Sequence, residues 1–140
     1  MTTDLDRLAA SLQEKMDDKA RKAYGEEKFA RWKEPRFAGV MDLPSAVGKA
    51  DQGAFTIFLR IEDQVITKAS FDTAACGPGI ISCDAACELA LGKTVDQAEA
   101  VTAEDILRLV QGLPSSKENN ANKAAAALAD ALQGWRSGRA

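Results

Sequence analysis

The 140-residue sequence predicts an α+β fold in which helices pack a small antiparallel sheet. Three observations support this prediction. The middle of the chain alternates apolar and polar residues as a strand does, the segments on either side repeat apolar residues at helical spacing, and the length fits one compact core.

Composition and charge exclude several protein classes. Apolar residues make up 46% of the chain and charged residues 28%, which is typical of a folded protein rather than of a disordered or collagen-like chain. With 18 basic and 21 acidic residues the net charge is −3, so we expect neither nucleic acid nor a membrane surface as a partner. The N-terminal region is charged from Asp4 onward, which predicts no signal peptide or membrane span and a cytoplasmic protein.

The first predicted element is an amphipathic helix over residues 4 to 23. Its apolar stripe consists of Leu5, Leu8, Leu12 and Met16, and Thr3 can cap its start. The stripe favours packing on the same domain. The alternative is a helix that docks on a partner or on a second copy of the chain.

Glycine and proline punctuate residues 25 to 48, so this segment is predicted to cross the surface as a loop, with a short helical turn at residues 29 to 32. Residues 55 to 62 then alternate as a strand, residues 62 to 64 favour a turn, and further strand-like residues follow at 65 to 67 and 69 to 71. Two or three antiparallel strands are expected.

Helical spacing returns after Gly79, where Ile80, Cys83, Cys87 and Leu91 form one apolar stripe. Thr102 begins a sequence that resembles a capping box and predicts a helix through residues 106 to 110. Asn122 can cap a last helix that carries Leu128, Leu132 and Trp135.

Cys76 is the first candidate for chemistry, because it follows a strand and precedes a Gly-Pro-Gly turn into a helix. Unpaired N–H groups and the positive end of the helix dipole favour a thiolate there, which could bind metal or accept sulfur. The alternative is a small residue in a tight turn. Since no histidine exists, a Cys-His pair is excluded.

Cys83 and Cys87 are spaced like two ligands of one metal ion on a helix face. They also continue the apolar stripe, and free cysteine is often buried, so core packing is favoured. All three cysteines are expected to be thiols. Asp63, Asp84 and Glu88 are interpreted as solvated charges, and no hydrolase or nucleotide-binding motif is present, so we expect no enzyme.

Several short segments of the sequence resemble the IscU/NifU N-terminal type of iron-sulfur cluster assembly scaffold. The matching segments, in chain order, are EPRFAG at 34 to 39, IFLRIED at 57 to 63, FDTAACGPGI at 71 to 80, GKTVDQA at 92 to 98, and GLP at 112 to 114 with Lys117. Their order and spacing agree over residues 29 to 135, so residues 29 to 140 are expected to form this domain and residues 1 to 28 a helical extension.

The resemblance implies a three-stranded antiparallel sheet with packed helices, and three cysteines, an aspartate and a histidine gathered at one end. In the family these groups receive sulfur from a cysteine desulfurase or another sulfur-transfer protein, bind iron, and pass the cluster to acceptor proteins. Thiolate is the soft ligand that such a cluster requires.

This sequence departs from the family at most of those positions. The first cysteine is replaced by Asp51, the aspartate by Gly53, and the His-Cys pair by Asn119 and Asn120, so only the central Cys76 remains. The Pro-Pro of the family, associated with chaperone recognition, is reduced to a single proline at 114.

A [2Fe-2S] cluster normally takes four protein ligands, and this chain offers Cys76 and the carboxylate of Asp51. The missing ligands could come from Cys83 or Cys87, or from a second chain in a homodimer held by the N-terminal helix. Cys76 could also accept only sulfur, as a persulfide. The favoured hypothesis is a divergent scaffold or carrier of iron or an iron-sulfur cluster. The alternative is an interaction or regulatory module that kept the fold without the cluster.

Overall fold

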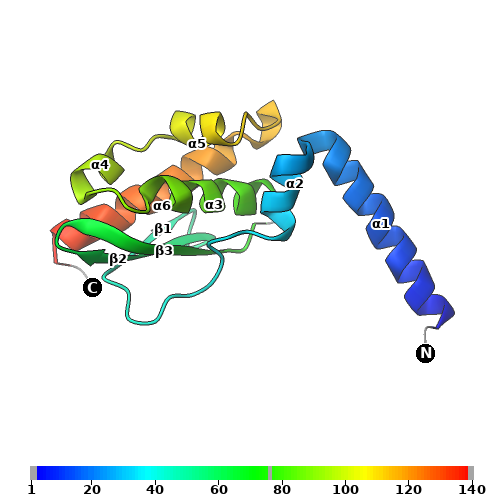
Figure 1. The fold of residues 1–140 in the computed structure, drawn as a ribbon, viewed down its shortest axis with the longest axis horizontal. Helices are drawn as coiled ribbons and strands as arrows, with labels where there is room; N and C mark the ends of the chain where they lie inside the picture. Colours follow the sequence, from blue (N-terminus) through cyan, green and yellow to red (C-terminus); the bar gives the residue numbers. More distant parts are fainter. Residues whose placement is uncertain (1–2, 76, 139–140) are drawn as a thin grey trace.

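The computed structural model describes residues 3–75 and 77–138. A three-stranded antiparallel sheet, in the order β1-β2-β3, lies against a layer of helices, and a long N-terminal helix extends away from both (Figure 1). The elements are α1 (Asp4–Tyr24), α2 (Glu26–Lys33), β1 (Ala46–Ala50), β2 (Phe55–Glu62), β3 (Val65–Thr73), α3 (Pro78–Ala90), α4 (Val95–Glu99), α5 (Ala103–Leu109), a 3-10 turn (Ser115–Lys117) and α6 (Asn119–Arg136).

The predicted hairpin is confirmed and is longer than expected. Strand β3 runs without a break from Val65 to Thr73, so the two short strand-like segments of the sequence are one strand. It pairs with β2 around a turn in which Asp63 and Gln64 take the left-handed conformation, with φ of 51° and 67°. This conformation matches the twist of two-residue hairpin turns.

The third strand lies in a segment that the sequence predicts to be loop. Strand β1 pairs with β2 from Ala46↔Leu59 to Ala50↔Phe55, and helix α6 packs across it. Gly48 looks like a turn residue, but a side-chain carbon on it would lie 2.0 Å from the Ala127 carbonyl oxygen. The glycine is therefore needed for close helix-sheet approach, which local pattern does not indicate.

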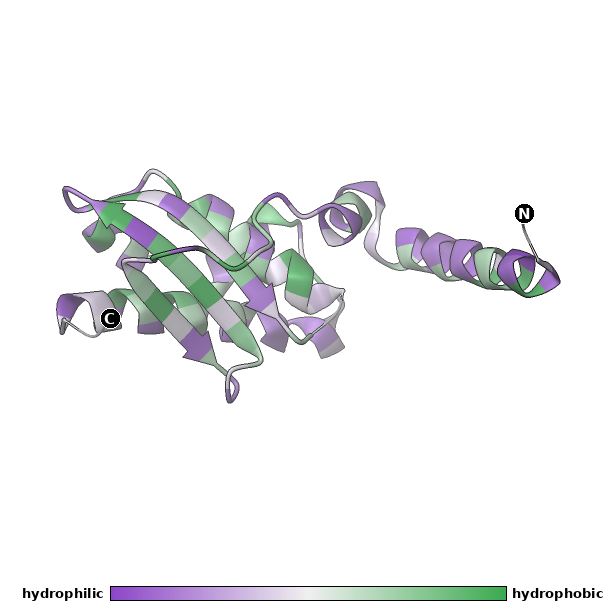
Figure 2. Ribbon diagram, turned by 90° about the horizontal axis from the view of Figure 1, so that it is seen from below, coloured by the Kyte–Doolittle hydropathy of each residue, from purple (hydrophilic) through white to green (hydrophobic). Residues whose placement is uncertain are grey.

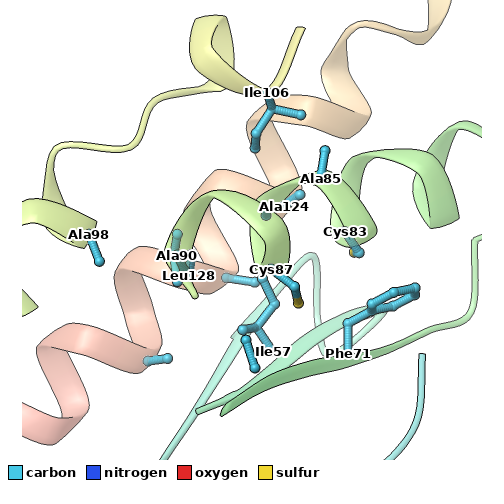
Figure 3. Packing of buried hydrophobic residues seen from close by; sticks show 14 of the residues in the cluster. Ile57, Phe71, Cys83, Ala85, Cys87, Ala90, Ala98, Ile106, Ala124 and Leu128 are labelled. Atoms are coloured by element: carbon cyan, nitrogen blue, oxygen red, sulfur yellow. The ribbon is translucent and has the colours of Figure 1, made fainter. Parts of the chain in front are cut away.

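The core lies between the sheet and helices α3 and α6. Figure 3 shows Ile57 and Phe71 of the sheet facing Cys83 and Cys87 of α3, with Leu128 of α6 beside them. All five side chains are buried. The alternation of β2 thus predicted its inner face correctly.

The start of the last helix and one short helix differ from the prediction. Helix α6 begins at Asn119 rather than after Asn122, so Asn122 lies inside it. Helix α4 was not predicted from the sequence, and it begins with a capping box at Thr94. The predicted capping box at Thr102 is confirmed. A five-residue helix is too short to show a periodic stripe.

The predicted packing of the N-terminal helix on its own domain is wrong. Thr3 caps α1 as expected, but the stripe residues are 52–75% exposed and only Ala20 is buried. Helix α1 packs against α2 and projects away from the sheet and the other helices (Figure 1). Among the described residues, no helix is long and apolar enough to cross a membrane.

Candidate functional site

Three segments that are distant in the sequence meet beyond one end of the sheet: the turn after β1, the start of α3 and the start of α6. Lys123 Nζ of α6 lies 2.9 Å from Oδ2 of Asp51 in the turn. A side-chain carbon built on Gly79 of α3 would lie 3.6 Å from Asn120 Oδ1 of α6. The fold therefore brings together three of the regions that the sequence singled out.

Cys76 falls outside the described residues, which include the chain on both sides of it. On one side, the Ala75 amide donates to Thr73 Oγ1 at 3.1 Å, and that hydroxyl donates to the Ala54 carbonyl at 2.8 Å. On the other side, Gly77 is the N-cap of α3 with φ 53° and ψ −106°, a conformation that essentially requires glycine. Pro78 then starts the helix.

Trp32 of α2 covers this turn. Its indole carbons would lie 3.4–3.5 Å from a side-chain carbon on Gly77, which is ordinary contact. Trp32 in turn meets Tyr24 and Phe29 edge to face, with ring centroids 5.8 and 6.4 Å apart. This aromatic group connects the end of α1 with the residue that follows Cys76.

Asp51 is held by an ion pair at the surface. It adopts a left-handed conformation with φ 53°, and its side chain is 45% exposed. Its partner Lys123 also lies over the Phe55 ring, 5.9 Å from the centroid. A metal ion that bound this carboxylate would compete with the lysine, while Gly53 in the same turn offers no side chain.

Neutral amides stand at the start of α6. Asn120 donates from Nδ2 to the Lys117 carbonyl at 2.9 Å, and Asn119 accepts through Oδ1 from Asn122 at 3.1 Å. Their side chains therefore fix the first turn of the helix. Amide oxygens are weak ligands for the iron of a cluster, which prefers thiolate.

Cys83 and Cys87 lie in the core, as their place on the apolar stripe indicated. Both are fully buried, and their sulfur atoms are seen among Ile57 and Phe71 in Figure 3. Burial raises the pKa of the Cys83 thiol to about 12, with a contribution from the charge of Asp84, and also raises the pKa of Cys87. Burial therefore disfavours, at both positions, the thiolate form that binds metal.

The interpretation of Asp84 as a solvated charge is wrong. Its side chain is 1% exposed and accepts from Arg31 Nη1 at 2.8 Å and from the Phe37 amide at 2.9 Å. Burial raises its pKa above the usual value even though these partners favour the ionised form. Glu88, one turn later, binds the other arm of the Arg31 guanidinium at 3.2 Å. Asp84 therefore fixes α2, and with it Trp32, against α3.

Within residues 3–75 and 77–138, no group of three or more cysteine, aspartate or glutamate side chains could hold a metal ion. The residues that sequence reasoning missed are Lys123 and Trp32. Neither belongs to a motif, and each is placed only by helix packing. Nothing in the sequence around a single lysine near the start of a helix indicates that it pairs with an aspartate 72 residues earlier in the chain.

Residues 23–140 match the family described as NifU-like N terminal domain. The chain is 29% identical over 113 residues to the iron-sulfur cluster assembly scaffold protein IscU 1 of Archaeoglobus fulgidus, covering 78% of this chain and 74% of that protein. It is 31% identical over 100 residues to the scaffold protein IscU of Aquifex aeolicus, covering 67% of this chain and 64% of that one.

Two solved structures have the same fold. A nitrogen-fixing NifU-like N-terminal protein from Brucella abortus aligns with a TM-score of 0.61 at 17% identity, over 84% of this chain and 98% of its own. A putative iron-sulfur cluster assembly scaffold for the SUF system from Fervidobacterium islandicum AW-1 aligns with a TM-score of 0.64 at 16% identity, over 80% and 98%. The three-stranded sheet with packed helices is thus the fold that the sequence predicted.

Proposed function

The chain belongs to the NifU-like N-terminal domain family, and we propose from this that it acts in iron-sulfur cluster assembly. Its role would be that of a scaffold or carrier that holds iron or sulfur through Cys76, without catalysing a reaction, in the cytoplasm. Residues 29–140 would be the functional domain and residues 1–28 an extension of it. The relatives that carry the name of cluster assembly scaffold support this proposal.

One observation carries the proposal: the turn at Asp51, the chain beside Cys76 and the start of α6 meet at one end of the sheet. These are the segments where the resemblance places cluster ligands. The start of a helix also lowers the pKa of a nearby thiol, because its unpaired N–H groups favour the thiolate. Helix α3 begins two residues after Cys76.

The simplest chemistry for Cys76 is to accept sulfur. Its thiolate would attack the outer sulfur of a persulfide on a cysteine desulfurase or another sulfur-transfer protein. A new S–S bond forms on Cys76, the S–S bond of the donor breaks, and the donor leaves as a thiolate, so no external oxidant is needed. Converting this sulfur into the sulfide of a cluster would require iron and two electrons from an external reductant, and the product would then be passed to acceptor proteins.

Holding a complete cluster requires more ligands than this end of the chain supplies. Cys76 and Asp51 provide two, and Asp51 is already paired with Lys123. Cys83 and Cys87 could contribute only if α3 opened, since both are fully buried. A cluster shared between two copies, each giving Cys76, is the arrangement that requires no unfolding of α3.

A second candidate function is an interaction module that keeps the fold without a cluster. The ion pair between Asp51 and Lys123 and the hydrogen-bonded amides of Asn119 and Asn120 favour it. Each of these groups stabilises local structure without a metal. Such a module would still bind a sulfur-transfer partner while it remained colourless.

Anaerobic reconstitution with iron and sulfide, followed by visible absorbance, tests the proposal. We expect charge-transfer bands in the native chain, none in Cys76→Ser, and unchanged bands in the control Cys83→Ala. A colourless native protein that accepts a persulfide on Cys76 would reduce the role to sulfur transfer. A colourless protein that accepts neither would contradict the proposal and support the interaction module.

A further inference from the structure

Helix α1 presents an apolar surface that no other residue of the described ranges 3–75 and 77–138 covers. The side chains of Leu5, Leu8, Leu12 and Met16 are 75%, 57%, 52% and 64% exposed. In Figure 1 the helix extends from the domain, and in Figure 2 its hydrophobic and hydrophilic residues both stand clear of the other elements. Contiguous exposed apolar residues with a polar surround are typical of an interaction surface.

The charges of α1 are unevenly divided along its length. Residues 4 to 14 contain three acidic side chains and one basic side chain, a net charge of −2. Residues 15 to 22 contain four basic and two acidic side chains, a net charge of +2. Asp17 is also paired within the chain, to Lys33 Nζ at 3.1 Å, so the second half presents mainly positive charge outward.

A partner that fits this surface needs an apolar stripe of the same length, positive where α1 is negative and negative where α1 is positive. A second α1 that runs in the opposite direction has these properties. If Leu5 of one copy faces Met16 of the other, then Ala9 faces Leu12, Asp6 faces Lys15 and Arg7 faces Glu14. The helix dipoles are then also opposed, which is favourable.

We propose that α1 is a self-association surface through which two copies of the chain pair antiparallel, along the stripe of Leu5, Leu8, Leu12 and Met16. The interface is isologous, so one two-fold axis closes it into a dimer and leaves no free stripe. A parallel pair would place like-charged halves side by side. Anionic lipid or nucleic acid would be repelled by the acidic first half of α1, residues 4 to 14.

The first test is the molar mass of the full chain, measured by light scattering after size exclusion over a range of concentrations. We expect the mass to rise from the 14.9 kDa of one chain toward twice that value as concentration increases. The double variant Leu8→Asp, Leu12→Asp should stay at the monomer mass throughout. Leu43→Asp, a control at another exposed leucine, should behave as the native chain does.

The second test is the direction of pairing, measured by disulfide capture between introduced cysteines in a Cys76→Ser background, in which the remaining Cys83 and Cys87 are buried. Leu5→Cys mixed with Met16→Cys should form a crosslinked dimer under mild oxidation. Leu5→Cys alone should not, because the two labels would lie eleven residues, or about 16 Å, apart along the helices, beyond the ~7 Å limit for the Cα atoms of a disulfide.

Three results would overturn the proposal. A native chain that stays monomeric at every concentration rules out self-association. A dimer that persists in the Leu8→Asp, Leu12→Asp variant assigns the interface to another surface. Efficient crosslinking of Leu5→Cys alone shows a parallel pair, which contradicts the charge argument. A native monomer that binds an unrelated amphipathic helix would identify α1 as a docking site for another protein.

Discussion

Gly48 is the position where a single methyl group should do the most damage to this fold. The β-carbon of an alanine there would lie 2.0 Å from the Ala127 carbonyl oxygen and 2.2 Å from the Ala131 amide nitrogen, both backbone atoms of α6. Ordinary contact begins near 3.4 Å. Helix α6 would therefore have to move more than 1 Å away from β1, or β1 would have to leave the sheet.

The cost of Gly48→Ala follows from what α6 touches. The helix packs against β1, β2, α3, α4 and α5, so a shift of this size opens several contacts at once. Overpacked cores lose about 1–3 kcal/mol, and a clash with backbone cannot be relieved by a rotamer change. We expect the free energy of unfolding to fall by at least about 3 kcal/mol, a large part of the ~5–15 kcal/mol of a typical domain.

Urea denaturation followed by circular dichroism measures this loss, with Gly53→Ala as the matched control. Gly53 lies in the turn after β1 with open space around its α-carbon, so its substitution should cost only about 1 kcal/mol of left-handed backbone strain. If Gly48→Ala lost no more stability than Gly53→Ala, the close packing of α6 on β1 would be refuted.

Three further predictions concern the side chains near the site. In the native protein at pH 8, no more than one of the three cysteines should react with a thiol reagent, because Cys83 and Cys87 are buried and have raised pKa values. All three should react in urea. A second cysteine that reacts fast in the native protein would contradict this. Lys123→Gln should increase the affinity for ferrous iron several-fold in an anaerobic titration by releasing Asp51, whereas Lys123→Arg should not; equal affinities would remove Asp51 from the ligand set. Burial raises the pKa of Asp84, so the stability that this carboxyl contributes is complete below about pH 3.8 and is lost as the pH rises through its folded-state pKa. The free energy of unfolding of the native protein, measured in urea relative to Asp84→Asn, should therefore decrease as the pH rises through this window. An increase would show that the Arg31 ion pair outweighs burial.

The chain of contacts behind the candidate site explains why it could be predicted only in part. The order of the segments that resemble the family located the thiol at Cys76 and the substitutions at Asp51, Asn119 and Asn120. The lysine that binds Asp51 was not, because that ion pair exists only once α6 lies beside the turn.

Burial of charge was the least predictable property. Asp84 sits in a helix between residues of an apolar stripe, and its sequence neighbours resemble those of a solvated carboxylate. It is buried because Arg31 and the Phe37 amide reach it from a segment about 50 residues earlier. These partners stabilise a charge that would be costly to bury alone.

The sequence by itself determined the fold class, the β2–β3 hairpin, the caps at Thr3 and Thr102 and the burial of Cys83 and Cys87, because each depends on residues close together in the chain. Only the tertiary structure decided that residues 46–50 form a strand, that the stripe of α1 stays uncovered and that Trp32 lies on Gly77. A local pattern states which face of an element is apolar. Which surface that face meets, or whether it meets any, depends on the packing of distant segments.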